Sequence, residues 1–293
     1  MSILTRTRAH LPGRSLAAQL SALRANISRR SFANTAGVDS KIIVGLETGR
    51  GTLASLRRVA DALGHYVSPY PSALANKRLH LGIGIRGCGV SHPALLSLEQ
   101  TGDGLVATYE TVCKALGERP RLLTIVPTWY TPEPLLRAIL DGLGLDRFDL
   151  DPASPCPPTA PTRTYFTERD GGLWLPWTAR TVWCNPPYDQ VPAWTDKARA
   201  EITAGRAQRL LLLIPYRPET KCHQSLVADP TARILIFDRR ITFGGRRNHL
   251  DSASALVCWG LSDVEFVRLA GHLPASHELR MSPVGNRPHL PAI

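Results

Sequence analysis

The sequence lacks several patterns that mark well-known protein classes. Its six cysteines are scattered, with no CxxC pair, which argues against a zinc site and against a disulfide framework. We therefore expect reduced thiols, no bound metal and a cytoplasmic location. No run of about 18 apolar residues occurs, so no membrane-spanning helix is expected. The first residues, MSILTRTRAHLPGR, are basic but lack the apolar core of a secretory signal.

Acidic residues are scarce relative to basic ones. Lys and Arg total 35 against 24 Asp and Glu, which gives a formal net charge of +11. The imbalance is strong in residues 1–60, where ten basic residues accompany only Asp39 and Glu47. Such a surplus suits the phosphate backbone of a nucleic acid. A basic surface that serves only solubility is the alternative, and the motifs below favour nucleic acid.

Two segments of the first 117 residues resemble each other. In both, a Gly-Val pair precedes a short polar residue that can cap a helix, and Leu-Glu and Leu-Gly pairs follow at matching positions. The segments are AGVDSKIIVGLETGRGTLASLRRVADALG, residues 36–64, and CGVSHPALLSLEQTGDGLVATYETVCKALG, residues 88–117. We predict small all-α domains over residues 15–68 and 74–120.

The first copy resembles the helix-turn-helix domain of the Cro and phage-repressor family. That pattern of a small residue, Gly, Val and Ser, then an apolar residue, Glu and Gly, is nearly complete here. The resemblance implies that residues 39–46 form a recognition helix, with Ser40, Lys41 and Val44 facing DNA. The second copy departs from the pattern, because its preceding helix would come from the glycine-rich LHLGIGIRGCG. It is a second DNA-binding module, a packing module or a dimerisation module, and a homodimer through these modules is one expectation.

After the second copy, short apolar runs alternate with helical patterns. Buried strands are predicted at residues 148–151, 181–184, 209–215, 232–237 and 254–259. Helices are predicted over Thr131–Gly144, with a Thr cap and a Gly stop, and over residues 192–205. The alternation predicts a mostly parallel α/β sheet covered on both faces, in a domain over residues 125–262. We expect a disordered, proline-rich tail over residues 275–293.

Polar residues follow two of these strands, at the edge where open α/β sheets bind ligands. FDLD supplies Asp149 and Asp151, which can accept hydrogen bonds from an ammonium or from ribose hydroxyls; loop capping is the alternative. TVWCNPPY supplies the Asn185 amide oxygen, the Pro186 carbonyl held by the next proline, and the flat ring of Tyr188. Two acceptors and an aromatic face suit an amino group on an aromatic base or an amide.

The order of motifs resembles the phage-type N6-adenine DNA methyltransferases over residues 129–260. The motifs are WYTPEPLL, FDLDPAS, TVWCNPPYDQ, LLLLIPYRPETKCH, ILIFDRRITFGG and SASALVCWG. The resemblance implies a Rossmann-like fold and S-adenosylmethionine as cofactor. The fold must be abbreviated, because only 33 residues separate Asp151 from Cys184 and no GxGxxG is present.

The same resemblance implies roles for individual residues. Asn185 and the Pro186 carbonyl would bind the adenine amino group, Pro187 would keep the turn rigid, and Tyr188 would stack on the base. The implied cofactor residues are Asp149, Asp151, Thr131 and Pro132, the last two at the methionine end. Separately, Arg240, Arg246 and Arg247 flank ITFGG and are expected to contact the DNA backbone near the target; a solvated basic face is the alternative.

Together these patterns predict a site-specific DNA adenine-N6 methyltransferase fused to helix-turn-helix DNA-binding modules, as suits phage or restriction-modification systems. Two alternatives stay open. One is a transcriptional repressor whose α/β half is inactive. The other is a methyltransferase that acts on a protein glutamine, whose amide the same motif can bind.

Overall fold

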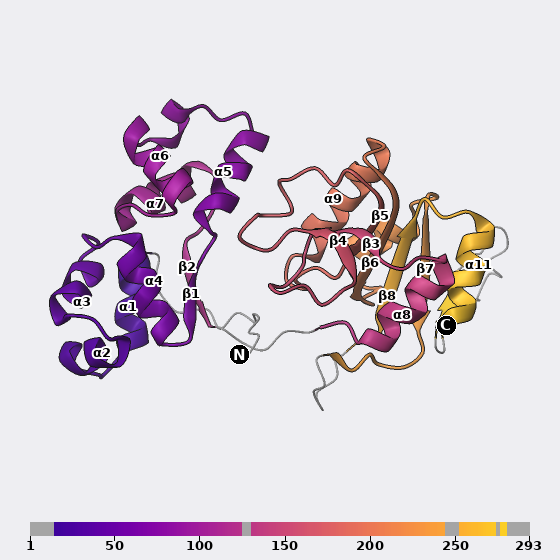
Figure 1. The fold of residues 1–293 in the computed structure, drawn as a ribbon, viewed down its shortest axis with the longest axis horizontal. Helices are drawn as coiled ribbons and strands as arrows, with labels where there is room; N and C mark the ends of the chain where they lie inside the picture. The colour runs from indigo at the N-terminus through magenta and orange to yellow at the C-terminus, as the bar shows by residue number, and fades with distance from the viewer. Residues whose placement is uncertain (1–14, 125–129, 244–251, 274–275, 280–293) are drawn as a thin grey trace, which may run out of the picture. The chain divides into compact units, whose positions relative to one another are not determined.

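The computed structural model describes residues 15–124, 130–243, 252–273 and 276–279 (Figure 1). The chain divides into two compact units. The first comprises residues 1–130 and 151–177, and the second comprises residues 131–150 and 178–293. Nowhere in the described ranges does a helix have the length and apolar character needed to cross a membrane.

The first unit contains two copies of one pattern of helices and a strand. Buried residues from both copies form a single apolar core. The first copy consists of α1 (Leu16–Arg24), α2 (Arg29–Ala36), α3 (Ser40–Glu47), α4 (Leu53–Ala62) and β1 (His65–Ser68). The second consists of α5 (Pro71–His80), the 3-10 helix η1 (Ile85–Cys88), α6 (His92–Thr101), α7 (Val106–Ala115) and β2 (Arg121–Thr124). The structural repeat is therefore longer than the repeat visible in the sequence.

Local sequence signals explain the ends of α2 and α3. Gly37 ends α2 in the left-handed conformation, with φ of 62°, where glycine carries no Cβ penalty. Asp39 then caps α3, because its carboxylate accepts a hydrogen bond from the Lys41 backbone N–H at 2.7 Å. In the second copy the glycine-rich stretch forms only the short η1, as expected from the cost of glycine in a helix.

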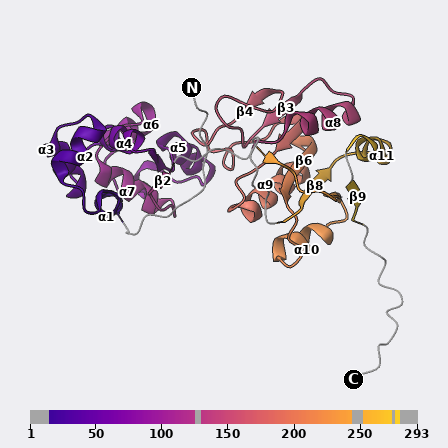
Figure 2. The same ribbon diagram turned by 90° about the horizontal axis from the view of Figure 1, so that it is seen from below.

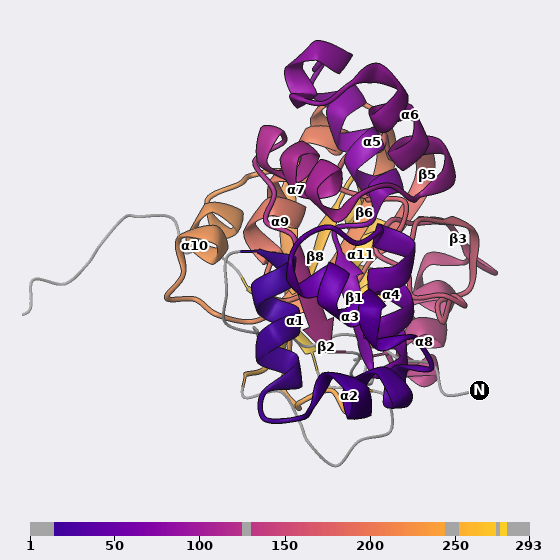
Figure 3. The ribbon, with the colours of Figure 1, turned by 90° about the vertical axis from the view of Figure 1, so that its left-hand side faces the viewer.

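The sequence predicted all-α domains in this part of the chain, and that prediction is wrong because the first unit also contains strands. Strands β1 and β2 form an antiparallel ribbon from His65↔Thr124 to Ser68↔Arg121. Helices α1 and α4 flank this ribbon (Figure 3). Four residues between a glycine and a proline are too few to show a strand pattern, and the partner strand lies far away in the sequence. The pairing therefore depends on the tertiary fold.

Residues 151–177 belong to the first unit although they lie between two strands of the predicted α/β domain. They pack against α5, where the Asn76 side-chain N–H donates to the Asp170 carbonyl at 2.8 Å. Close approach requires a glycine at position 171, because an added Cβ would lie 2.9 Å from that of Ala73. The predicted domain boundaries at residues 120 and 125 do not include this return of residues 151–177 to the first unit.

The α/β part of the chain is built on a seven-stranded sheet in the order β4-β3-β5-β6-β8-β7-β9. Its strands are β3 (Phe148–Asp151), β4 (Thr162–Tyr165), β5 (Ala179–Cys184), β6 (Ala207–Pro215), β7 (Ala232–Phe237), β8 (Ser254–Trp259) and β9 (Ser276–Glu278). Pairs β3–β5 and β5–β6 are parallel. Pairs β6–β8, β8–β7 and β7–β9 are antiparallel.

The prediction of a mostly parallel sheet is therefore wrong, because β8 runs antiparallel between β6 and β7. A parallel neighbour needs a crossover of a dozen or more residues, usually a helix. The connection from β7 to β8 has no α-helix in its described part, so the chain returns in the opposite direction.

Helices cover both faces of the sheet in the second unit. They are α8 (Glu133–Leu143), α9 (Val191–Thr203), α10 (Lys221–Val227) and α11 (Asp263–His272). Figure 2 shows α8 and α11 on one side of β6 and β8, with α9 and α10 on the other. The middle parts of β6 and β8 are apolar for this reason, and Leu210–Leu213 and Ala255–Val257 are fully buried.

Strand β9 lies inside the segment, 275–293, that the sequence predicted to be disordered. It adds to the free edge of β7, which offers unpaired backbone groups. Arg233 of β7 also bonds to Glu278 at 2.9 Å. The prediction is wrong for these residues, and positions 280–293 lie outside the described part of the chain.

Gly142 allows α8 to lie close to α11, and its replacement tests this packing. A Cβ at position 142 would lie 2.9 Å from the Leu269 Cα. Gly142→Ala should lower the free energy of unfolding by about 1–3 kcal/mol, measured by urea denaturation. The control is Gly271→Ala in α11, where an added Cβ meets nothing within 4 Å; it should be neutral or stabilising by up to about 1 kcal/mol. Equal stability of both variants would contradict the close approach.

Candidate active site

Strands β3 and β5 place the two polar stretches at the same edge of the sheet. The strands are parallel, with Leu150 opposite Val182, so their carboxyl ends lie side by side. β3 ends at Asp151, and Asn185 follows directly after β5. Ligands of open α/β sheets bind at this edge, as the sequence analysis expected.

The Asn185 side chain is oriented by Thr131. Its Nδ2 donates a hydrogen bond to the Thr131 Oγ1 at 3.1 Å. The predicted Thr cap is wrong, because α8 begins at Glu133 with Pro132 at its N-cap and without a side-chain cap bond. Since the amide nitrogen and oxygen share one carbon, holding Nδ2 also fixes the direction of the acceptor oxygen. Thr131, predicted to line a cofactor site, thus contacts the predicted substrate clamp directly.

The turn after Asn185 holds an aromatic ring in place. Pro186 is buried and Pro187 is exposed, and the Pro187 carbonyl accepts a hydrogen bond from the Gln190 N–H at 3.0 Å. The Tyr188 ring meets the edge of Phe243, with ring centroids 6.1 Å apart and planes at 79°. The Tyr188 phenol oxygen is buried and has no hydrogen-bond partner among the described residues. Burial raises the pKa of this phenol, so it stays neutral at physiological pH.

Phe243 was not recognised from the sequence. It is fully buried and lies in the stretch ITFGG, beside the arginines predicted to contact DNA. The available signal was an aromatic residue in a mostly polar connection between two buried strands. Its place against Tyr188 depends on contacts between distant parts of the chain.

The two aspartates of FDLD differ in their surroundings. The Asp149 Oδ2 accepts a hydrogen bond from the Thr181 backbone N–H at 2.9 Å, which joins β3 to β5. Asp151 is only 4% exposed, and its Oδ1 accepts from the Ala153 N–H at 3.0 Å. Burial raises the pKa of Asp151 to about 7, against the opposing effect of its bonds to Ala153 and Ser154.

The predicted DNA-contacting residues are divided between the two units. Ser40, Lys41 and Val44 are exposed on α3 of the first unit, while Ile43 and Leu46 of the same helix are buried. Arg240 is exposed in the second unit. Arg246 and Arg247 lie outside the described residues. Within the described ranges, no group of three or more His, Cys, Asp or Glu residues could hold a metal ion.

Comparison with known proteins supports the resemblance for part of the chain. Residues 125–256, a little under half of the chain, match the family described as DNA N-6-adenine-methyltransferase (Dam). The match contains the Thr131–Asn185 pair, Asp151 and Tyr188. No curated protein matches the chain, and no solved structure matches it. The resemblance of the first unit to helix-turn-helix domains stays a prediction.

Asp151 should couple folding to pH. Its pKa in the folded protein is about 7, above the ordinary value of about 4 that applies when unfolded. The stability linked to its proton is therefore complete below about pH 4 and is lost as the pH rises through about 7. Urea denaturation between about pH 4 and pH 8 should show a steeper decline for the wild type than for Asp151→Asn. The same decline in both proteins would contradict a protonated, buried Asp151.

Proposed function

We propose that the chain is an S-adenosylmethionine-dependent DNA adenine-N6 methyltransferase whose first unit binds DNA. The observation that carries this proposal is the turn at the end of β5. There Thr131 orients the Asn185 amide and Phe243 supports the Tyr188 ring. The family match over residues 125–256 supports the same assignment.

Asn185 and Pro186 act on the amino group of adenine. Its nitrogen lone pair is delocalised into the ring, which makes it a poor nucleophile. Hydrogen bonds from the amino group to the Asn185 Oδ1 and the Pro186 carbonyl favour tetrahedral geometry and localise the lone pair. The nitrogen becomes cationic during transfer, and the same acceptors then stabilise the charge. Because the methylated nitrogen is acidic, the proton passes to water without a strong base.

Tyr188 binds the base after it has left the helix. Extrusion costs a few kcal/mol, and stacking on an aromatic side chain recovers about 1–3 kcal/mol. The edge contact with Phe243 holds the Tyr188 ring, so little side-chain entropy is lost on binding. Because the phenol is neutral, it adds no negative charge that would compete with Asn185 and Pro186 for the amino group.

The residues at the sheet edge fit S-adenosylmethionine. When bound, this cofactor supplies an electrophilic methyl group on a sulfonium. The buried Asp151 carboxyl is suited to its hydroxyl or ammonium groups, and Thr131 and Pro132 precede α8 near Asn185. Asp149, whose carboxylate bonds to Thr181, fixes β3 against β5 and thereby positions Asp151.

The DNA-binding surface is centred on α3. Its exposed residues Ser40, Lys41 and Val44 follow a tight turn from α2. Glu47 at the end of α3 bonds to Arg24 at 2.5 Å and to Arg29 at 2.6 Å. These pairs hold α3 against the two helices before it. The alternative substrate, a protein glutamine, provides no role for this exposed basic surface.

Asn185→Ala should strongly slow methyl transfer. Loss of an oriented acceptor is expected to lower the rate of N6-methyladenine formation by about 10²–10³-fold. The measurement is transfer of labelled methyl from S-adenosylmethionine to unmethylated DNA, with separation of the product nucleosides. Tyr188→Phe is the matched control, because it keeps the ring and removes only the unpaired phenol oxygen; its rate should stay within a few-fold of the wild type. Wild-type protein that binds DNA but transfers no label would overturn the enzyme and support the repressor, and label in protein glutamine would redirect the substrate.

Lys41→Ala should weaken DNA binding by the full chain. Removal of one phosphate contact lowers affinity on all sequences and reduces the slope of log K against log salt by about 1. Titrations between about 50 and 200 mM salt measure both quantities. Lys114→Ala, an exposed lysine of α7, is the control and should leave both unchanged. Identical binding by wild type and Lys41→Ala would exclude α3 as the contact surface.

A further inference from the structure

Equivalent residues of the two copies exchange hydrogen bonds in the first unit. The Leu53 N–H, at the start of α4, donates to the Gly104 carbonyl at 2.8 Å. The Val106 N–H, at the start of α7, donates to the Gly51 carbonyl at 3.0 Å. Between them, Thr52 and Leu105 form an antiparallel bridge. Reciprocal contacts of this kind mark a two-fold relation between the copies.

The strand ribbon obeys the same relation. β1 follows α4, and β2 follows α7. The first residue of each strand faces the last residue of the other, as His65↔Thr124 and Ser68↔Arg121. An antiparallel ladder of equivalent strands has a two-fold axis through its centre. Figure 1 shows α4 and α7 beside each other next to this ribbon.

Each copy also contains the same internal ion pair. Arg24 in the last turn of α1 bonds to Glu47 of α3 at 2.5 Å. Arg78 near the end of α5 bonds to Glu99 of α6 at 2.6 Å. The two pairs place α3 and α6 alike within their copies, although η1 replaces a regular helix in the second.

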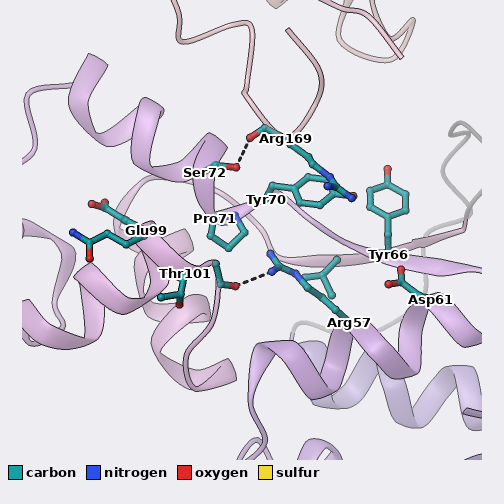
Figure 4. A pocket seen from close by; sticks show the side chains of 12 residues that line it. Arg57, Asp61, Tyr66, Tyr70, Pro71, Ser72, Glu99, Thr101 and Arg169 are labelled. Carbon is teal, nitrogen blue, oxygen red and sulfur yellow. Dashed lines mark hydrogen bonds between the residues drawn. The ribbon is translucent and has the colours of Figure 1, made fainter. Parts of the chain in front are cut away.

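The copies cannot separate without exposing their shared core. The apolar core is continuous from Leu16 to Leu122. Figure 4 shows Arg57 of α4 donating to the Gly102 carbonyl at the end of α6, at 2.7 Å. The Tyr109 hydroxyl of α7 donates to the Pro69 carbonyl at 2.6 Å. A single chain therefore contains an internal counterpart of a two-fold dimer.

The exposed positions of α3 and α6 differ in charge. On α3 and its C-cap these residues are Ser40, Lys41, Val44 and Thr48, and the equivalent positions of α6 are His92, Pro93, the half-buried Leu96 and Gln100. α6 therefore has hydrogen-bonding groups but no lysine or arginine at these positions. The two surfaces cannot contact the same DNA sequence with equal strength.

From these observations we infer that one chain binds a two-part DNA site, with α3 in one major groove and α6 in the next, and no second chain. This inference rests on the proposed DNA binding by α3. Two-fold-related recognition helices contact half-sites about one helical turn apart. Sequence preference is concentrated in the half that α3 contacts, so the target is not a palindrome. The internal pairing takes the place of the homodimer that the sequence suggested.

The test uses the full chain and a duplex selected with wild-type protein from a random library. Sedimentation gives the number of chains per duplex, and hydroxyl-radical footprinting gives the protected blocks. The variant His92→Glu/Gln100→Glu places two carboxylates on α6. Thr111→Glu/Ala115→Glu, on the exposed side of α7, makes the same charge change as the control.

We expect one chain per duplex and two protected blocks about 10 base pairs apart. The α6 variant should lose one block and about tenfold or more in affinity, while the control keeps both blocks. If unfolding measurements show that the α6 variant is not folded, His92→Ala/Gln100→Ala should still weaken the same block.

Other results would overturn the inference. Two chains per duplex would do so, as would a footprint that the α6 substitutions leave intact while Lys41→Ala still weakens binding. In those cases DNA binding by α3 stands. Failure of Lys41→Ala to weaken binding would instead remove the proposed function on which the inference rests.

Discussion

The hydrogen bond from the Thr181 backbone to the Asp149 carboxylate fixes the arrangement on which the candidate site depends. It joins β3 to β5 where the strands run parallel, so that Asp151 and Asn185 follow at the same edge of the sheet. The side-chain bond from Asn185 to Thr131 then adds the start of α8. The proposed substrate clamp and the proposed cofactor-binding carboxyl thus depend on one strand pair.

The two units are stabilised in different ways. The second unit is built on an open, mixed sheet covered by helices on both faces, and a few polar side chains lie at one edge of that sheet. The first unit buries little per helix, because each helix is short, and it gains its core by combining two copies. Its stability and its proposed binding surface therefore depend on the same internal pairing.

Charge is distributed according to these roles. Several acidic side chains are used in ion pairs within the fold, such as Glu47 with Arg24, Glu99 with Arg78, and the fully buried Glu201 with Arg206 at 2.6 Å. Basic side chains such as Lys41 remain exposed. Because each of these ion pairs uses one basic and one acidic residue, the surplus of basic residues in the sequence remains for side chains that phosphate groups can contact.

The sequence by itself determined features that depend on neighbouring residues. These are the Asp39 cap of α3, the glycine stops at Gly37 and Gly144, the buried strands, and the Asn-Pro-Pro-Tyr turn after β5. Only the tertiary structure decided the antiparallel insertion of β8, the β1–β2 ribbon, the contact of Phe243 with Tyr188, and the bond from Asn185 to Thr131. Caps and turns are set by adjacent backbone groups, whereas these pairings join residues far apart in the chain, which local patterns do not encode.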